Sequence, residues 1–441
     1  MTISIVLQFV VVLAAIWMGA RSSGVGLGLW GAVGLLVLVV VFGVDPTSPP
    51  IDVMLIILAV IMAASVMDAA GGIDFLVRIA ERVIRANPKY VTIVAPLTTW
   101  SFSFVAGTGH IVYPLLPVIY ETAHQSGIRP ERPMAVSTIA SQQAITASPV
   151  AAATAAMIGL FAEKGLTQWG LPQILMVCVP ATLTGVLVAA VVSMFVGKDL
   201  EDDPEYQAAL KSGAIPPPTA VAERPPLSPA AKRSAFIFLT GVALVVVFGF
   251  FPALRQLPGA KDPLDMPTVI EIIMLSVAAV MLLVTRVPVD EVPKTPTLRA
   301  GVVAVIGIFG LAWLGDSFIG ANKAVIVPAI SAMTEAAPWT FAIGLFAASV
   351  LLYSQAATTR ALMPLGVALG IPPQFLIAVF PSVNGYFFIP TYGSLIAAIN
   401  FDRSGTTRIG RYVLNHSFMI PGLVATFVAV FTGLVLAKLM F

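Results

Sequence analysis

Long apolar runs dominate the chain, and most of them have the length of a helix that crosses a bilayer. One crossing needs about 20 mostly apolar residues. Several runs carry Pro, Gly and Ser in mid-run, and lipid tolerates a broken helix only where protein or a water-filled cavity satisfies the freed backbone groups. The pattern predicts an all-α polytopic membrane protein with broken helices. The predicted runs are 3–20, 24–44, 53–70, 90–107, 134–161, 171–196, 234–251, 268–284, 300–320, 340–353, 375–399 and 413–440.

One long polar segment interrupts these runs. Residues 197–233 contain an acidic cluster and the proline-rich stretches 215–219 and 224–229, which is the composition of a linker. The linker separates an N-terminal membrane half, 1–196, from a C-terminal half, 234–441. Each half has apolar spans and then a segment broken by Gly, Ser or Pro, as expected of a transporter built from repeats.

Composition supports a membrane protein and excludes several classes of function. Of the 441 residues, 58% are hydrophobic and 10% are charged, against about 25% charged in soluble domains. The net charge of +2 gives no footprint for nucleic acid. With one cysteine, Cys178, and three histidines, we expect no disulfide, no metal site, no cofactor and no enzyme active site.

Basic residues in short loops predict the orientation. Arg21 follows the first span, a cluster of Arg and Lys follows the third, and Arg403, Arg408 and Arg411 precede the last. We expect these loops and the linker in the cytoplasm, and both termini in the periplasm.

Two polar segments in the first half are candidate ligand sites. In the stretch Gly107-Thr108-Gly109-His110, the side chains of Thr108 and His110 and the backbone N–H groups are possible donors to an anion at a broken helix; the alternative is a surface loop. Residues 137–154 crowd hydroxyls and amides into an uncharged run, and an unpaired amide in hydrocarbon costs several kcal/mol. A re-entrant hairpin that lines a polar cavity explains this segment, and hydrogen bonding between helices is the alternative. Its candidate residues are Ser141, Gln142, Gln143, Ser148 and Pro149.

A similar segment occurs in the second half. Ser382, Asn384 and Pro390 stand 241 positions after Ser141, Gln143 and Pro149. Thr391 follows them, and Ser354 and Gln355 precede them as Thr108 precedes the first segment. We therefore expect the two segments to meet at the middle of the membrane.

Charged residues near the spans are further candidates. Arg360 is a possible bidentate partner for a carboxylate, or a side chain that reaches from a helix end to the interface. Asp316 is a possible partner of Lys323. Residues 72–87 have helical amphipathic spacing and predict an interfacial helix, in which Glu81 and Arg85 are placed to form a pair. This polar face is either merely solvated or a gating or regulatory contact.

Several strings resemble one family. They are 87–96, Gly107-Thr-Gly-His110, 128–135, Ser148-Pro149, 354–357, the long basic string 401–411, and 415–418. The chain is similar to the anaerobic C4-dicarboxylate transporters of bacteria, the Dcu A/B family, over essentially its whole length.

The resemblance implies an inner-membrane carrier of fumarate, succinate, malate and aspartate. It also implies the fold of the larger ion-transporter superfamily, with two inverted repeats, each with a re-entrant helical hairpin, in a homodimer. By this resemblance Ser141 to Pro149 lie on the first hairpin and Ser382 to Thr391 on the second. Glu81, Arg85 and Arg129 fall on charged positions of the family pattern.

The charge of the substrate favours one transport mode. A dicarboxylate carries about two negative charges, and each costs roughly 2.3 kcal/mol against about 100 mV. One-for-one exchange moves no net charge, so electroneutral antiport is the leading hypothesis. Proton-coupled symport through Asp316, Asp68 or Glu81 is an alternative. So are a role as co-sensor partner of a dicarboxylate-sensing histidine kinase and an intramembrane hydrolase with Ser141 or Ser148 as nucleophile and His110 as base.

Overall fold

The computed structural model describes residues 3–22, 25–213, 215, 226–260, 263–336, 339–352, 354–412 and 414–441, without the side chains of 20, 27, 323 and 326–336. Most of the predicted linker stretch 215–219 and the side chain of Lys323 therefore lie outside the described part. The α-helices of the first half and linker are α1 (Ile3–Ser22), α2 (Gly26–Phe42), α3 (Ile51–Ala69), α4 (Gly72–Arg85), α5 (Val91–Ala106), α6 (Leu116–Gln125), α7 (Glu131–Gln143), α8 (Ala152–Glu163), α9 (Leu171–Ser193) and α10 (Pro204–Lys211).

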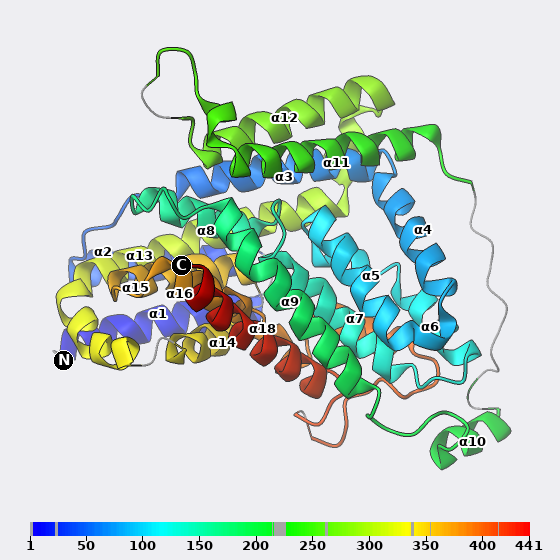
Figure 1. Cartoon of the computed structure of the whole chain (residues 1–441). Helices are drawn as coiled ribbons and strands as arrows, with labels where there is room; N and C mark the ends of the chain where they lie inside the picture. The colour runs from blue at the N-terminus through cyan, green and yellow to red at the C-terminus, as the bar shows by residue number, and fades with distance from the viewer. Residues whose placement is uncertain are drawn as a thin grey trace.

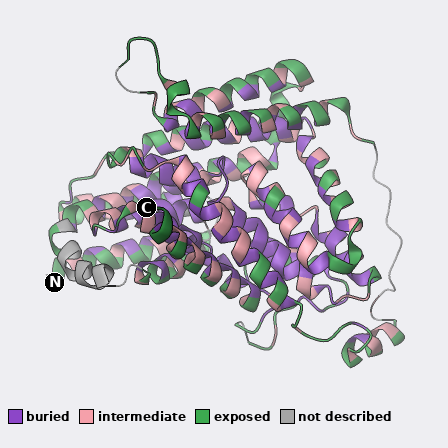
Figure 2. Ribbon diagram, viewed as in Figure 1, coloured by how far each residue is buried: buried purple, intermediate pink, exposed green. Residues whose placement is uncertain are grey.

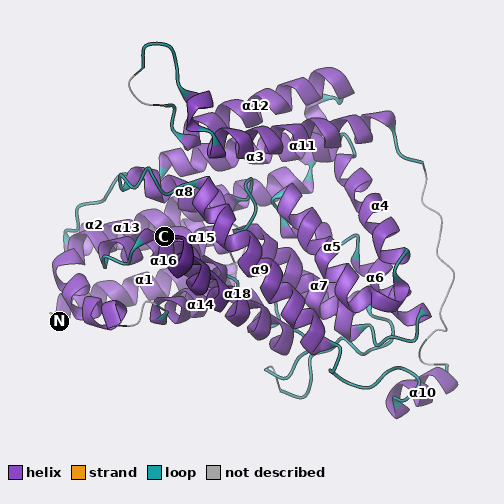
Figure 3. Ribbon diagram, viewed as in Figure 1, coloured by secondary structure: helices purple, strands orange, loops and turns teal. Residues whose placement is uncertain are grey.

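The second half is also helical throughout its described residues. Figure 3 shows helices and loops without strands in the described chain. The α-helices are α11 (Pro229–Phe250), α12 (Met266–Thr285), α13 (Pro296–Ala336), α14 (Thr340–Leu352), α15 (Gln355–Ala368), α16 (Pro373–Val379), α17 (Gly393–Phe401) and α18 (Met419–Met440). Short 3-10 helices include η2 (Gly109–Val112), η6 (Phe380–Val383) and η7 (Gly385–Phe387).

The predicted apolar runs coincide with helices, and the two most polar runs are broken. The run 134–161 divides into α7 and α8, and the run 375–399 divides into α16, η6, η7 and α17. Pro149 accounts for the first break, because it has no N–H to donate and disfavours a helical Ser148. The polarity of these runs therefore marked the positions of the breaks.

Six helices of the described part are long and apolar enough to cross a membrane: α3, α9, α11, α12, the segment 296–322 of α13, and α18. Large apolar residues on them and on their neighbours are exposed, for example Val40 of α2 (71% exposed) and Phe427 of α18 (72% exposed). In Figure 2 the exposed residues of these helices are green. Water would penalise this surface, whereas lipid does not. The structure is therefore consistent with a membrane protein.

Helices from the two halves pair with each other. In Figure 1, α3 of the first half lies beside α11 and α12 of the second, and α9 lies against α18. The α2–α13 pair is the tightest of the approaches, because a Cβ on Gly310 would overlap the backbone of Gly28. Small residues allow such backbone approach between helices in lipid. The inverted repeats and the two re-entrant hairpins stay predictions.

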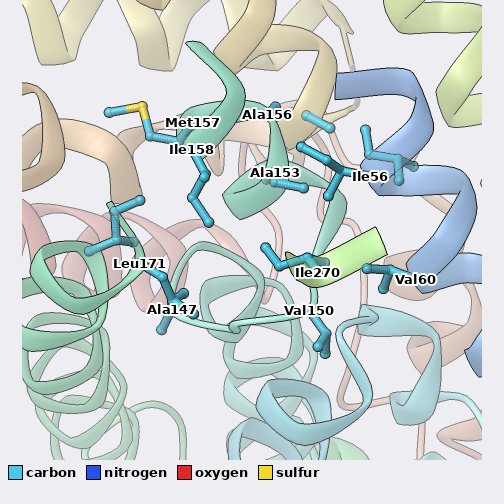
Figure 4. Close-up of a cluster of buried hydrophobic side chains, with 14 of the residues drawn as sticks. Ile56, Val60, Ala147, Val150, Ala153, Ala156, Met157, Ile158, Leu171 and Ile270 are labelled. Atoms are coloured by element: carbon cyan, nitrogen blue, oxygen red, sulfur yellow. The ribbon is translucent and has the colours of Figure 1, made fainter. Parts of the chain in front are cut away.

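An apolar core surrounds the break between α7 and α8. Figure 4 shows Ala147 and Val150 of the break with Ile56 of α3, Leu171 of α9 and Ile270 of α12. The residues of the break thus have packing partners from three other helices. Such packing fixes a non-helical backbone that would otherwise be free to move.

The predicted amphipathic helix is confirmed as α4. Its apolar face is buried, and Arg85 donates to Glu81 at 3.0 Å, which confirms the predicted pair. A second bond from Arg85 reaches Glu121 of α6, also at 3.0 Å. Arg85 therefore joins α4 to α6, which the sequence did not predict.

The linker contains a docked helix, α10. Asp203 caps it by accepting from the N–H groups of Glu205 and Tyr206. The guanidinium of Arg129 donates to Asp203 at 2.6 Å, and the Tyr206 hydroxyl lies 2.6 Å from Nε2 of His124. The helix is thereby held against the loop that follows α6.

Acid should release α10. Burial raises the pKa of Asp203, but the N–H of Tyr206 and the guanidinium of Arg129 outweigh it, and the net pKa lies below the ordinary 3.8. A depressed pKa stabilises docking above 3.8, and this contribution is lost as the pH falls through the folded-state value. The protection factors for hydrogen exchange of 204–211 should stay constant down to pH 5 and fall below pH 3.8. Asp203→Asn should lower these protection factors already at pH 7. Unchanged protection factors in this variant would contradict the capping role of Asp203.

Candidate functional site

The breaks of both halves converge on one cavity of about 710 Å³. Its wall is formed by the turn after α5, the break between α7 and α8, and the starts of α13, α15 and α17. The expected meeting of the two polar segments is therefore seen in the lining of this cavity. Six of the predicted residues line it: Thr108, His110, Gln142, Ser354, Gln355 and Thr391.

Four amide side chains join the halves beside this cavity. Gln355 donates to Oε1 of Gln142 at 2.8 Å and to Oδ1 of Asn384 at 3.1 Å. Asn384 donates to Oε1 of Gln143 at 3.3 Å, and Gln143 donates to Thr426 at 2.9 Å. All four amides are buried, and buried amides need such partners. Within the described residues Nε2 of Gln142 has no acceptor, so this group remains available to a ligand.

Four helices begin at the cavity. Ala152 and Ala153 of α8, Pro296 of α13, Gln355 and Ala356 of α15, and Gly393 of α17 line it. The first N–H groups of a helix lack internal partners, and its N-terminus carries about half a positive charge. An anion in the cavity would therefore lie near four positive helix ends.

The predicted hydroxyl groups mostly serve the breaks themselves. Ser354 caps α15 by accepting from Ala357 N–H, and Thr108 caps η2 by accepting from His110 N–H. Ser141 donates to the carbonyl of Thr138 at 2.8 Å, and Ser382 donates to that of Val379 at 2.6 Å.

The remaining predicted residues lie behind the cavity wall. Ser148 accepts from Val150 N–H at 3.3 Å, and the prolines Pro149 and Pro390 are buried in the breaks. No described hydrogen bond joins Ser141 or Ser148 to His110, so the arrangement expected of a hydrolase is not seen in the described residues.

Comparison with known proteins decides the family. The family model described as "Anaerobic c4-dicarboxylate membrane transporter" (DcuA_DcuB) matches residues 4–441. The chain belongs to the DcuA/DcuB family. It is 41% identical to the C4-dicarboxylate transporter DcuA of Escherichia coli K12, with 99% of this chain and 100% of that protein covered. It is 38% identical to the anaerobic C4-dicarboxylate transporter DcuB of Escherichia coli O6:H1, with 98% of each covered, and 39% identical to DcuA of Wolinella succinogenes, with 99% and 100% covered.

Two solved transporters share the fold of this DcuA/DcuB chain. MtrF of Neisseria gonorrhoeae, described as one of a class of antimetabolite efflux pumps, has a TM-score of 0.52 at 13% identity and covers 93% of this chain and 85% of its own. The YdaH transporter of Alcanivorax borkumensis, with an unusual topology, has a TM-score of 0.51 at 15% identity and covers 92% and 89%. At these identities the likeness concerns the fold alone.

One cation of this DcuA/DcuB chain was missed by sequence reasoning. Arg299 lines the cavity and is exposed there, and no carboxylate forms an ion pair with it among the described residues. It stands in the first turn of α13, where the helix dipole disfavours a cation. The predicted apolar run began at residue 300, so Arg299 fell just outside it. The one signal in the sequence was that Arg299 directly precedes the apolar run 300–320.

Arg360, the predicted partner of a substrate carboxylate, does not line the amide cavity. It is 1% exposed and donates to Glu163 at 3.1 Å and to Asp316 at 3.4 Å. Asp316 thus pairs with Arg360 in the described structure. Glu163 and Asp316 line a different cavity, of about 600 Å³, which Arg360 does not line. The triad joins α8, α13 and α15, and does not belong to the amide cavity.

Gly109 sets the position of Gln142. A Cβ on Gly109 would overlap the amide of Gln142, so Gly109→Ala should displace this amide and break its bond with Gln355. Losing one such bond costs about 1 kcal/mol, and we expect roughly a five-fold weaker succinate affinity in calorimetry. Gly344→Ala is the control, since a Cβ there meets no atom within 4 Å. If both variants bound succinate with the same affinity, the Gln142 amide would have no role in succinate binding.

Proposed function

We propose that the chain exchanges C4-dicarboxylates, namely fumarate, succinate, malate and aspartate, by electroneutral antiport and binds them in the amide cavity. The observation that carries the proposal is the joint presence of four helix N-termini and Arg299 around one cavity. The names of the relatives support the substrate class. Gln142 and Gln355 supply neutral polar groups beside these positive ones.

The positive charge around the cavity is moderate. Four helix ends supply about +2 in partial charge, and Arg299 adds one full charge. Only one carboxylate of a dianion is therefore offered a formal cation by the described lining. Because the other carboxylate meets helix ends and amides, the site can bind a dianion and still release it.

The exchange mode rests on the cost of moving charge. Transport of one dianion against about 100 mV costs roughly 4.6 kcal/mol, whereas one-for-one exchange costs nothing electrically. In this mode the carrier changes between its inward-open and outward-open states when a dicarboxylate is bound.

Labelled succinate tests this proposal in proteoliposomes. Vesicles preloaded with fumarate should take up labelled succinate much faster than empty vesicles, because only the former allow exchange. An imposed membrane potential should leave the preloaded rate unchanged. Equal uptake by loaded and empty vesicles would contradict exchange, and no uptake by either would contradict dicarboxylate transport itself.

A further inference from the structure

A second, basic cavity of about 490 Å³ lies at the ends of α7, α9 and α18. Much of its wall comes from the loop 402–418, which carries the long basic string of the sequence. No residue of this wall lines the amide cavity. The proposed transport site therefore leaves this part of the chain without a role.

The loop has a defined backbone conformation. The carboxylate of Asp402 accepts from Ser404 N–H at 2.9 Å, from the Thr406 hydroxyl at 2.8 Å and from Thr407 N–H at 2.6 Å. Ile409 and His416 form an isolated antiparallel bridge. The side chains between these anchors are thus presented by a fixed backbone.

Four arginines face the basic cavity, and two of them are already neutralised. Arg129 pairs with Glu131 and Asp203, each at 2.6 Å, and Arg132 pairs with Asp199 at 2.6 Å. Arg408 has one long, exposed contact of 3.4 Å with Glu205, and such pairs contribute little.

Arg411 is the least neutralised of the four. It lies over the ring of Tyr412 and has no carboxylate partner among the described residues. The cavity therefore offers two cations, Arg408 and Arg411, that a ligand can engage without breaking a strong ion pair.

Uncharged donors add to these cations. The hydroxyl of Ser193 is buried, with the residue 2% exposed, and has no hydrogen-bond partner. The exposed Asn415 also lines the cavity and carries an uncharged side-chain amide. A buried hydroxyl without a partner is costly, so its presence in the wall points to a ligand that accepts from it.

The position of the cavity indicates the source of the ligand. Ser193 ends α9 and Ile420 belongs to the first turn of α18, and both helices are long enough to cross the membrane. Ile409 and Ile420 are 41% and 51% exposed. Polar donors at the ends of spanning helices, next to exposed apolar side chains, match the depth of lipid headgroups.

We propose that the basic cavity binds the phosphate of an anionic phospholipid. The phosphate accepts from Arg408, Arg411 and the Ser193 hydroxyl, and the acyl chains lie along α18 from Ile420 onward. The same donors fit free inorganic phosphate, which the experiment below separates from the lipid. This site is independent of the transport proposal.

Native mass spectrometry of the purified chain in detergent, titrated with phosphatidylglycerol, tests the site. We expect one tightly retained phosphatidylglycerol and weaker binding of zwitterionic phosphatidylcholine. Each surface arginine near an anionic lipid contributes about a five-fold factor at 1.4 kcal/mol per ten-fold. The double variant Arg408→Gln/Arg411→Gln should therefore weaken the binding of phosphatidylglycerol by roughly 30-fold.

Two further variants test whether the effect is specific to the cavity. Arg403→Gln removes the same charge from the same loop but outside the cavity wall, and it should leave the affinity unchanged. Ser193→Ala should weaken binding by roughly five-fold through one lost hydrogen bond, which covers the case that the double variant does not fold.

Three results decide the outcome. Millimolar inorganic phosphate that displaces phosphatidylglycerol and binds equally well without lipid would keep the site and assign it to free phosphate. Equal retention of phosphatidylcholine and phosphatidylglycerol would overturn the proposal. So would an Arg403→Gln variant that loses as much affinity as the double variant.

Discussion

Arg299→Gln is expected to weaken succinate binding by about 10- to 100-fold and to reduce exchange in proportion. A hydrogen bond to a charged group contributes about 1.5–3 kcal/mol, and each 1.4 kcal/mol is ten-fold. The unfavourable place of Arg299 in the first turn of α13 means that its removal should not destabilise the fold. Calorimetry with succinate measures the affinity, and thermal unfolding of the same sample measures the stability.

Two further variants define what Arg299 does. Arg299→Lys retains the charge but not the bidentate geometry, and it should recover part of the affinity. Lys294→Gln removes a neighbouring exposed charge that pairs with Glu291 at 2.7 Å and should bind succinate normally. Normal affinity in Arg299→Gln would contradict a role in binding for Arg299, which is the one formal cation of the described cavity lining.

The second large effect concerns stability. Arg360→Met should destabilise the fold by about 3 kcal/mol or more, because removing one partner of a buried pair leaves a buried charge uncompensated. Arg360 holds two carboxylates, of which Asp316 is the more buried. The thermal midpoint in detergent should therefore fall markedly, with the loss visible in the absence of substrate.

A double variant separates packing from charge. Arg360→Met/Asp316→Leu removes the pair together, and replacing a buried pair by apolar side chains is often neutral. Its thermal midpoint should return most of the way toward that of the unmodified chain, since Glu163 is partly exposed and can be hydrated. A double variant less stable than Arg360→Met would contradict this account of the triad.

Sequence patterns predicted the parts of the site that depend on local chemistry. Amides in an apolar run are costly without partners, so Gln142, Gln143 and Asn384 marked the segments that meet, and the structure joins them through Gln355. The break between α7 and α8 was also predictable from local chemistry, because Pro149 has no N–H and cannot continue the hydrogen bonds of a helix. The confirmed Glu81–Arg85 pair is likewise local, since its partners stand one helical turn apart.

Contacts between distant parts of the chain were beyond prediction. The chemistry of its side chain predicted that Arg360 binds a carboxylate, but could not say which one. Its partner Glu163 stands 197 positions away, and no spacing rule connects the two residues. Arg299 flanks an apolar run as many interfacial arginines do, so its place on the cavity wall depends on how α13 packs. The docking of α10 was hidden for a similar reason, because the pair between Arg129 and Asp203 exists only in the folded chain.

A crystal structure with bromosuccinate tests the central claim most directly, because the anomalous signal of bromine locates a dicarboxylate without assumptions about its contacts. We predict a single strong bromine peak in the amide cavity, with a carboxylate beside Arg299 and a second one near Gln142 and the start of α15. A peak at the Arg360 triad or in the basic cavity, with none in the amide cavity, would contradict the account.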